Sequence, residues 1–377
     1  TAHELAVLDN AEAMDVLVTV GLLSDNYELE KYIGGRLKKI RSPDSVERLC
    51  YHANQHKDHR VRLVLSMVLA GRSERNALKA ALTNLYDNNQ AVVFATLEGL
   101  RERKSLSVVD HLIRALQHQE DLGRGGDLIC YEFRQALLEL TGEDFELAAD
   151  WQNFWGAHKN GFERKVGEGK KKLTFVNREP PLFFGTEVLT KRVVFVLDIS
   201  GSMSKKDPLP EEEGDARNKR NKPANIPDSR QRLRRVQKEL INVITKLPQD
   251  TQFNIITFNH EIGFFRESLV PASSTNKSRA IAFVRAFQAE GETHTDAALR
   301  AVFDLPGIDA IFLLSDGAPR RNDRLLDIDP IIRWVRQENR FRRVRLNTVA
   351  FQQGGKTMRR FMRQLAQYNN GQYKELR

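Results

Sequence analysis

Five oxygen-bearing side chains, spread over three short stretches of the sequence, have the types and spacing of a metal site. The stretches are DISGS, in which one carboxylate and two hydroxyls alternate with other residues, GETH and LLSDG. The side chains are Asp198, Ser200, Ser202, Thr293 and Asp316. Two carboxylates and three hydroxyls form an all-oxygen set, which suits a hard cation with octahedral ligation and water in the remaining positions. Mg²⁺ is therefore the expected occupant, with Mn²⁺ or Ca²⁺ as alternatives.

The elements that precede these stretches explain how they could meet. The apolar runs 193–197 and 310–314 indicate strands that are buried on both faces of a sheet. Strand and helix patterns alternate through this half of the chain, which predicts a mostly parallel α/β sheet covered on both faces. Because ligands bind where the carboxyl ends of such strands meet, the three stretches are expected at one edge of the sheet.

The expected strands are 193–197, 253–258, 263–266, 310–314, 344–351 and one near Tyr373, and the expected helices are 232–247, 277–288, 296–303, 330–339 and 358–368. Between the first strand and its helix, residues 205–230 combine four prolines and mixed charge with almost no large apolar residue. This composition predicts a disordered insertion that leaves from the rim of the site.

Together, the DxSxS turn after a hydrophobic strand, the later Thr293 and the LLSDG segment resemble the metal-ion-dependent adhesion site of the von Willebrand factor type A domain. The resemblance covers residues 183–377. It implies a doubly wound, Rossmann-like α/β fold in which Ser200, Ser202 and Thr293 ligate the metal directly. Asp198 and Asp316 would act directly or through water. A sixth position would be left for an acidic side chain of a protein partner.

The sequence departs from this family at one position next to a candidate ligand. The family usually has a small residue, commonly Gly, before the threonine, and this chain has Glu292. Three placements of the Glu292 carboxylate are open: at the metal, in the partner's position, or in solvent. Thr295 is a rival to Thr293 as a ligand.

The N-terminal part of the chain reads differently, as amphipathic helices from about Ala11 to Glu139. The stretch at His59 resembles the stretch at Gln90, an offset of 31 residues, and this period predicts stacked helix pairs that resemble HEAT repeats. An all-α repeat domain is expected over residues 1–158, with an aromatic-rich last helix as its cap. A linker is expected over 159–182 and the type A domain over 183–377.

A cluster of three histidines in this region has helical spacing. His52, His56 and His59 would share a face of one continuous helix and could then ligate a metal. Lys57 and Asp58 look like an interhelix turn that places His59 beyond the helix end. A solvated helix terminus is therefore the preferred interpretation.

The charge is unevenly distributed, and this bears on the choice of partner. The net charge of +9 divides into −6 over residues 1–150 and +12 over residues 191–377, with the small remainder between them. A non-enzymatic, metal-dependent protein-binding module is the leading hypothesis. RNA binding is an alternative, because helical repeats followed by a type A domain also resemble the Ro ribonucleoprotein architecture. A regulatory subunit for an ATPase partner, as some bacterial type A domains are, is a further alternative.

Several other functional classes lack their signatures. The sequence has no GxSxG elbow, no HExxH motif and no pair of carboxylates arranged for acid–base work, so no enzyme is expected. No apolar run is long enough to span a membrane. Cys50 and Cys130 are expected to be buried rather than paired. Because residue 1 is Thr rather than Met, an exported or periplasmic location is slightly favoured over the cytoplasm.

Overall fold

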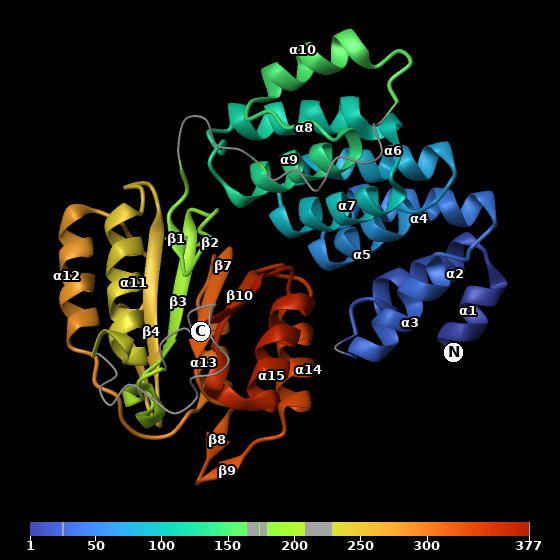
Figure 1. Cartoon of the computed structure of the whole chain (residues 1–377). Coiled ribbons are helices and arrows are strands. Elements are labelled where there is room, and N and C mark those ends of the chain that lie inside the picture. The colour runs from blue at the N-terminus through green and yellow to red at the C-terminus, as the bar shows by residue number, and fades with distance from the viewer. Residues whose placement is uncertain (25, 164–172, 174–178, 208–227, 377) are drawn as a thin grey trace, which may run out of the picture. The chain divides into compact units, whose positions relative to one another are not determined.

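The computed structural model divides the chain into two compact units, Thr1–Glu179 and Pro180–Arg377 (Figure 1). The structure describes residues 1–24, 26–163, 173, 179–207 and 228–376. Most of the glycine- and lysine-rich run expected as the linker lies outside these residues, as does the middle of the expected insertion. The units divide within the stretch 159–182 that was expected to join them.

The first unit is all-helical in its described part, as predicted. Its helices are α1 (Ala2–Leu8), α2 (Ala11–Val16), α3 (Tyr27–Leu37), α4 (Pro43–Gln55), α5 (His59–Ala70), α6 (Arg75–Thr83), α7 (Gln90–Arg103), α8 (Val109–Asp121), α9 (Leu128–Thr141) and α10 (Ala148–His158). No helix among the described residues of either unit is both long and apolar enough to cross a membrane.

The helices of this unit form two layers around one core. In one layer α3 packs against α5, α5 against α7 and α7 against α9, and in the other α4 packs against α6 and α8 against α10. Trp151 and Trp155 of α10 are buried, so the aromatic stripe docks this last helix as expected. Such layering is what a HEAT-like stack requires, and that assignment remains a prediction.

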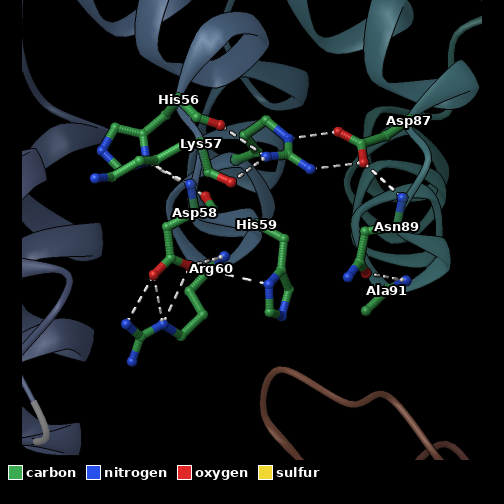
Figure 2. A network of polar contacts seen from close by, with 9 residues as sticks. His56, Lys57, Asp58, His59, Arg60, Asp87, Asn89 and Ala91 are labelled. Atoms are coloured by element: carbon green, nitrogen blue, oxygen red, sulfur yellow. Dashed lines mark hydrogen bonds and ion pairs between the residues drawn. The ribbon is translucent and has the colours of Figure 1, made fainter. Parts of the chain in front are cut away.

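The 31-residue period reappears in the way two helices begin (Figure 2). Asp58 precedes α5, and its Oδ1 accepts a hydrogen bond of 2.8 Å from the backbone N–H of Arg60. Asn89 precedes α7, and its Oδ1 accepts one of 3.0 Å from the N–H of Ala91. Side-chain oxygens at this position satisfy N–H groups that have no partner within the helix. The same capping device therefore occurs at equivalent positions of two successive helix pairs.

Arg62 connects these two capping regions. Its Nε lies 2.6 Å from Asp87 Oδ2, and its Nη1 donates to the carbonyl oxygen of His56 at 2.7 Å. Asp87 in turn accepts the N–H of Asn89 at 2.8 Å. One guanidinium thus joins the turn before α5 to the turn before α7.

The histidine cluster is divided by the predicted interhelix turn. Helix α4 contains His52 and ends at Gln55, His56 is its C-cap, and His59 begins α5, so the three histidines do not lie on one continuous helix. His52 is buried, and its Nε2 lies 2.6 Å from Asp15 Oδ1. The interpretation as a solvated terminus was therefore wrong for His52, which is buried and paired with half-buried Asp15 of α2.

The second unit is built on a mostly parallel sheet of the order β11-β10-β7-β3-β4-β5, with β6 also paired to β4. Its strands are β3 (Arg192–Asp198), β4 (Gln252–Phe258), β5 (Ile262–Phe264), β6 (Val270–Pro271), β7 (Ala310–Ser315), β10 (Arg345–Phe351) and β11 (Tyr373–Leu376). The pairs among β3, β4, β7, β10 and β11 are parallel, and β5 and β6 run antiparallel to β4. The predicted doubly wound, Rossmann-like fold is confirmed.

Helices cover both faces of this sheet (Figure 1). They are α11 (Arg232–Lys246), α12 (Ser274–Arg285), α13 (Thr295–Asp304), α14 (Ile328–Asn339) and α15 (Gly355–Tyr368). Successive side chains of a strand point to opposite faces. Phe195 and Leu197 accordingly pack in the core under α11 and α12, whereas Val194 and Val196 pack in the core under α13, α14 and α15. The apolar run of β3 therefore serves two cores.

Two short hairpins were not foreseen as strands. They are β1 (Leu182–Phe183) with β2 (Thr186–Glu187), and β8 (Arg320–Arg321) with β9 (Arg324–Leu325). Two-residue strands are too short to show a hydrophobic period. The first hairpin packs beside the sheet as the expected lead-in does, with the Phe183 ring centroid 5.3 Å from that of Phe195.

Ordered structure extends further into the expected insertion than predicted. Lys206 forms a β-bridge with Gln231, and a helical turn covers Asp228–Arg230. Asp207 is buried, and its Oδ1 lies 2.8 Å from Nε of Arg232. The expected disorder is therefore wrong for residues 205–207 and 228–230, where ion pairing compensates for the lack of apolar residues.

Candidate functional site

The register of β3 against β7 places the first candidate ligand beside the loop of the last one. Leu197 pairs with Leu314, so Asp198 and Ser315 come next on the two strands. Ser315 Oγ donates a hydrogen bond of 2.5 Å to Asp198 Oδ2, and the N–H of Ser200 donates one of 2.8 Å to Asp198 Oδ1. Asp198 is fully buried, and protein donors satisfy both of its carboxylate oxygens.

Hydroxyl groups continue from this buried carboxylate to the surface. The Oγ atoms of Ser200 and Ser202 lie 3.1 Å apart, and Ser202 Oγ donates to Asp316 Oδ1 at 2.5 Å. Ser200 and Asp316 are buried, whereas Ser202 is half-buried in the turn Gly201–Ser204. The structure thus brings together four of the five predicted site residues through hydrogen bonds.

The fifth predicted residue, Thr293, joins the group through loop contacts. Two backbone hydrogen bonds hold its loop against the DISGS turn: Gly201 N to Gly291 O at 3.0 Å and Glu290 N to Ile199 O at 2.9 Å. A Cβ atom at Gly317 would lie 3.3 Å from Thr293 Oγ1, so the threonine also contacts the Asp316 loop. All three predicted loops therefore meet at the carboxyl edge of the sheet.

Gly291 is required by the path of the threonine loop. Its φ is +71°, and a Cβ atom there would lie 1.9 Å from Nδ1 of His260. Side chains other than glycine are disfavoured by this backbone conformation, and the imidazole leaves no room for one. His260 therefore acts as a packing partner of the loop in this structure.

A pocket of about 830 Å³ opens at this edge. Ser202, Thr293 and Asp316 line it, while Asp198 and Ser200 lie beneath it. Thr295, the rival to Thr293, is fully buried at the start of α13, and its Oγ1 has no hydrogen-bond partner among the residues that the structure describes. The position of Thr293 fits the predicted ligand role better.

Glu292 takes none of the three expected placements. Its Oε2 lies 2.9 Å from His294 Nε2, and its two oxygens accept the backbone N–H groups of Asn322 at 3.1 Å and Asp323 at 2.8 Å. The hydrogen bond with His294, followed by the bond from Asp323, lowers the pKa of Glu292. The carboxylate is thus used to hold the turn of the β8–β9 hairpin.

Sequence reasoning missed a buried group of charges behind the pocket. Arg232, the first residue of α11, donates from Nη1 to Asp316 Oδ2 at 2.6 Å and from Nε to Asp207 Oδ1 at 2.8 Å. Arg235, one turn later, also pairs with Asp207. The composition of residues 205–230 predicts disorder at Asp207, and a single arginine at a helix start gives no signal of its own. The sequence also gives no sign that Ser315, a residue of the LLSDG segment, hydrogen-bonds to Asp198.

The electrostatics of the interior oppose a second negative charge. Burial raises the pKa of Asp198 to about 7, and the charge of Asp316 acts in the same direction, against the hydrogen bonds from Ser200 and Ser315. Taking a carboxylate out of water disfavours its charged form. A cation near both carboxylates would favour ionisation of Asp198.

The donors present fit a hard divalent cation. Within the described ranges, no three His, Cys, Asp or Glu side chains gather as a metal-binding group, so a soft or imidazole-rich site is not indicated. The oxygens that gather here belong to Ser200, Ser202 and Asp316, joined by hydrogen bonds, and to Thr293, which lines the same pocket. Hydroxyl and carboxylate oxygens are the ligands that Mg²⁺ and Ca²⁺ prefer.

Comparison with known proteins agrees with the fold. Residues 227–375 match the family model of the von Willebrand factor type A domain. Human inter-alpha-trypsin inhibitor heavy chain H4 is 33% identical over 152 residues, which cover 36% of this chain and 14% of the relative. Human von Willebrand factor A domain-containing protein 3A is 25% identical over 192 residues, covering 50% of this chain and 14% of the relative. The similar region thus spans a small part of either relative.

Among solved structures, the von Willebrand factor type A protein from Catenulispora acidiphila is similar with a TM-score of 0.37 and 15% identity, covering 49% of this chain and 38% of that one. The family match includes Thr293 and Asp316 and begins after the DISGS turn. Residues 227–375, with the mostly parallel sheet and flanking helices to which they contribute, therefore belong to a von Willebrand factor type A domain.

Proposed function

We propose that this chain is a divalent-metal-dependent protein-binding module, without catalytic activity, in which an acidic side chain of the partner completes a Mg²⁺ site. The observation that carries this proposal is the meeting of Ser202, Thr293 and Asp316 in one pocket at the carboxyl edge of the sheet. Ligands bind at this edge in open α/β sheets. The match to the type A family supports the same conclusion.

Each of the five residues has a role in this proposal. Ser200, Ser202 and Thr293 would hold the metal with hydroxyl oxygens, Asp316 would act directly or through water, and buried Asp198 would act through the groups that it orients. The bound ion would supply a Lewis-acidic position for a carboxylate. Neutral hydroxyls withdraw little of its charge, which favours an anionic partner over water.

The helical unit has a separate role in the proposal. Its two-layered stack with repeated helix caps would serve as a HEAT-like scaffold that presents the type A domain or contacts further partners. The RNA-binding and ATPase-subunit alternatives gain no support from the described residues, and neither is proposed in its place.

Titration calorimetry with MgCl₂ tests the metal site. Ser202→Ala removes a hydroxyl that lines the pocket, and we expect its Mg²⁺ affinity to fall at least about tenfold, or 1.4 kcal/mol. Ser204→Ala is the matched control, because this exposed hydroxyl of the same turn donates to Gly201 O at 2.7 Å instead. Equal Mg²⁺ affinity in the wild type and Ser202→Ala would refute the site.

A further inference from the structure

The pocket at the candidate metal site is lined by more positive than negative side chains. Its charged lining residues are Lys205, Lys206, Arg232, Arg320 and Lys356 on the positive side, and Asp316 on the negative side. They come from the residues after the DISGS turn, the start of α11, the loop after β7, strand β8 and the start of α15. The excess positive charge is therefore a property of the whole rim rather than of one segment.

Two of these cations already have acidic partners. Arg232 is buried between Asp316 and Asp207, and Lys206 Nζ lies 2.7 Å from Asp228 Oδ1. Acidic side chains of the chain itself therefore offset these two charges, in the interior for Arg232 and at the surface for Lys206. They explain how the pocket is built and do not select a ligand by themselves.

The other three cations are not compensated. Lys205, Arg320 and Lys356 are exposed, and none has an ion pair with a described residue. Arg320 donates to the backbone carbonyl of Asp323 at 2.9 Å, which orients the guanidinium without neutralising it. The first turn of α15 borders the same pocket, and its N–H groups add to the positive potential.

The size of the pocket also exceeds what one carboxylate needs. Pockets of about 300–1,000 Å³ hold whole small ligands, and this pocket of about 830 Å³ falls in that range. A short stretch of polypeptide fits such a volume. Charge complementarity across an interface raises the association rate and excludes partners of the wrong sign.

We propose that the pocket binds an acidic segment of a partner protein, in which one carboxylate reaches the metal position and neighbouring carboxylates contact Lys205, Arg320 and Lys356. This inference rests on the proposed metal-dependent function and adds the class of partner. A single acidic residue in a neutral sequence would use only part of the site. Several consecutive acidic residues could contact both the metal position and the three cations.

Fluorescence anisotropy with labelled peptides tests the proposal on the full chain in the presence of MgCl₂. The probes are glycine- and serine-based peptides of equal length with one aspartate, with four consecutive aspartates, and with four asparagines. At low ionic strength we expect the four-aspartate peptide to bind at least about tenfold more tightly than the one-aspartate peptide, and the asparagine peptide not to bind. Equal affinities for the two acidic peptides would overturn the proposal.

Single substitutions then locate the contacts. Lys205→Ala, Arg320→Ala and Lys356→Ala should each weaken binding of the four-aspartate peptide by about two- to fivefold, as exposed ion pairs do. Lys246→Ala is the matched control, since this exposed lysine ends α11, whose first residue lines the pocket roughly 21 Å away along the helix. An equal loss in the control, or no loss in the three rim variants, would overturn the proposal.

Two further outcomes separate this inference from the metal-dependent function. If chelation of the metal leaves peptide binding unchanged while the rim variants weaken it, the proposal of an acidic partner is supported and the proposed metal-dependent function is refuted. If Mg²⁺ binds and the one-aspartate peptide binds as tightly as the four-aspartate peptide, the metal-dependent function is supported and the proposal of an acidic segment is refuted. A single-stranded oligonucleotide that displaces the four-aspartate peptide at equal charge concentration would assign the pocket to nucleic acid and overturn the proposal.

Discussion

Arg232 Nη1 donates a hydrogen bond of 2.6 Å to Asp316 Oδ2, and the two side chains are 6% and 0% exposed. The opposite carboxylate oxygen, Oδ1, accepts the hydroxyl of Ser202. The arginine therefore neutralises the carboxylate from behind while the other oxygen faces the candidate site. A buried charge at this position depends on its partner, because water cannot replace it.

Arg232→Gln should destabilise the second unit strongly. Breaking a buried ion pair by removing one partner costs about 3–5 kcal/mol, since an uncompensated charge remains. Added MgCl₂ should restore part of the loss by neutralising Asp316. Urea unfolding with and without MgCl₂ measures both effects.

The control for this experiment lies two residues further along α11. Arg234 is 59% exposed and lies 3.5 Å from the exposed Asp228, so Arg234→Gln should change the free energy of unfolding by less than about 1 kcal/mol. If Arg232→Gln and Arg234→Gln had the same free energy of unfolding, the ion pair between Arg232 and Asp316 would not stabilise the fold.

The two threonines of the α13 loop should respond in opposite ways to loss of their hydroxyls. Thr293→Val should lose Mg²⁺ binding, because its hydroxyl is at the pocket. Thr295→Val should keep Mg²⁺ binding and leave stability unchanged or raise it by up to about 1–3 kcal/mol, because Oγ1 is buried without a partner in the described structure. Calorimetry and thermal unfolding distinguish the two, and Mg²⁺ loss in Thr295→Val alone would reverse the assignment.

Gly291→Ala should cost more than the same change at another glycine with a similar backbone. Gly307 has φ of +67° and only Arg192 Nη1 within 4 Å, at 3.8 Å, so Gly307→Ala should cost about 1–2 kcal/mol through backbone strain. Gly291→Ala adds an overlap with His260 Nδ1 at 1.9 Å and should also weaken Mg²⁺ binding by shifting Thr293. Similar unfolding free energies for the two variants would contradict the tight packing of this loop.

The cap of α5 should make the helical unit sensitive to acid. The hydrogen bond from the Arg60 guanidinium lowers the pKa of Asp58, so the carboxylate stabilises the fold above its unfolded pKa of about 3.9. This stabilisation is lost as the pH falls through the folded-state pKa. Asp58→Asn keeps a capping oxygen and should remove the pH dependence that Asp58 contributes, whereas Asp58→Ala should cost about 0.5–2 kcal/mol near pH 6.

Urea unfolding followed by far-ultraviolet circular dichroism between pH 6 and pH 3 compares the three proteins. The wild type should lose stability relative to Asp58→Asn over the acidic part of this range. Parallel curves for the two proteins would show that the cap does not titrate with folding.

Most strands and helices of the second unit could be predicted from the local pattern of apolar and polar residues. The apolar run of β3 and the SDG at the end of β7 mark buried strands with polar ends. Both the sheet and the proximity of Asp198 to the Asp316 loop follow from this topology. The role of Arg232 depends on where Asp207 lies in three dimensions, which no local period records. The hydrogen bond that Glu292 accepts from Asp323 likewise could not be predicted, because it depends on a hairpin whose strands have only two residues each.

The residues that flank the segment 208–227 are hydrogen-bonded to each other across it. Lys206 bridges Gln231, and the N–H of Asp207 donates to the carbonyl of Arg230 at 3.0 Å. The closure cost of a chain whose ends are already held together grows only slowly with its length. The position of the candidate site should therefore depend little on how many residues lie between these anchors. A label or an added domain inserted between Asp207 and Asp228 should therefore leave Ser202 in place.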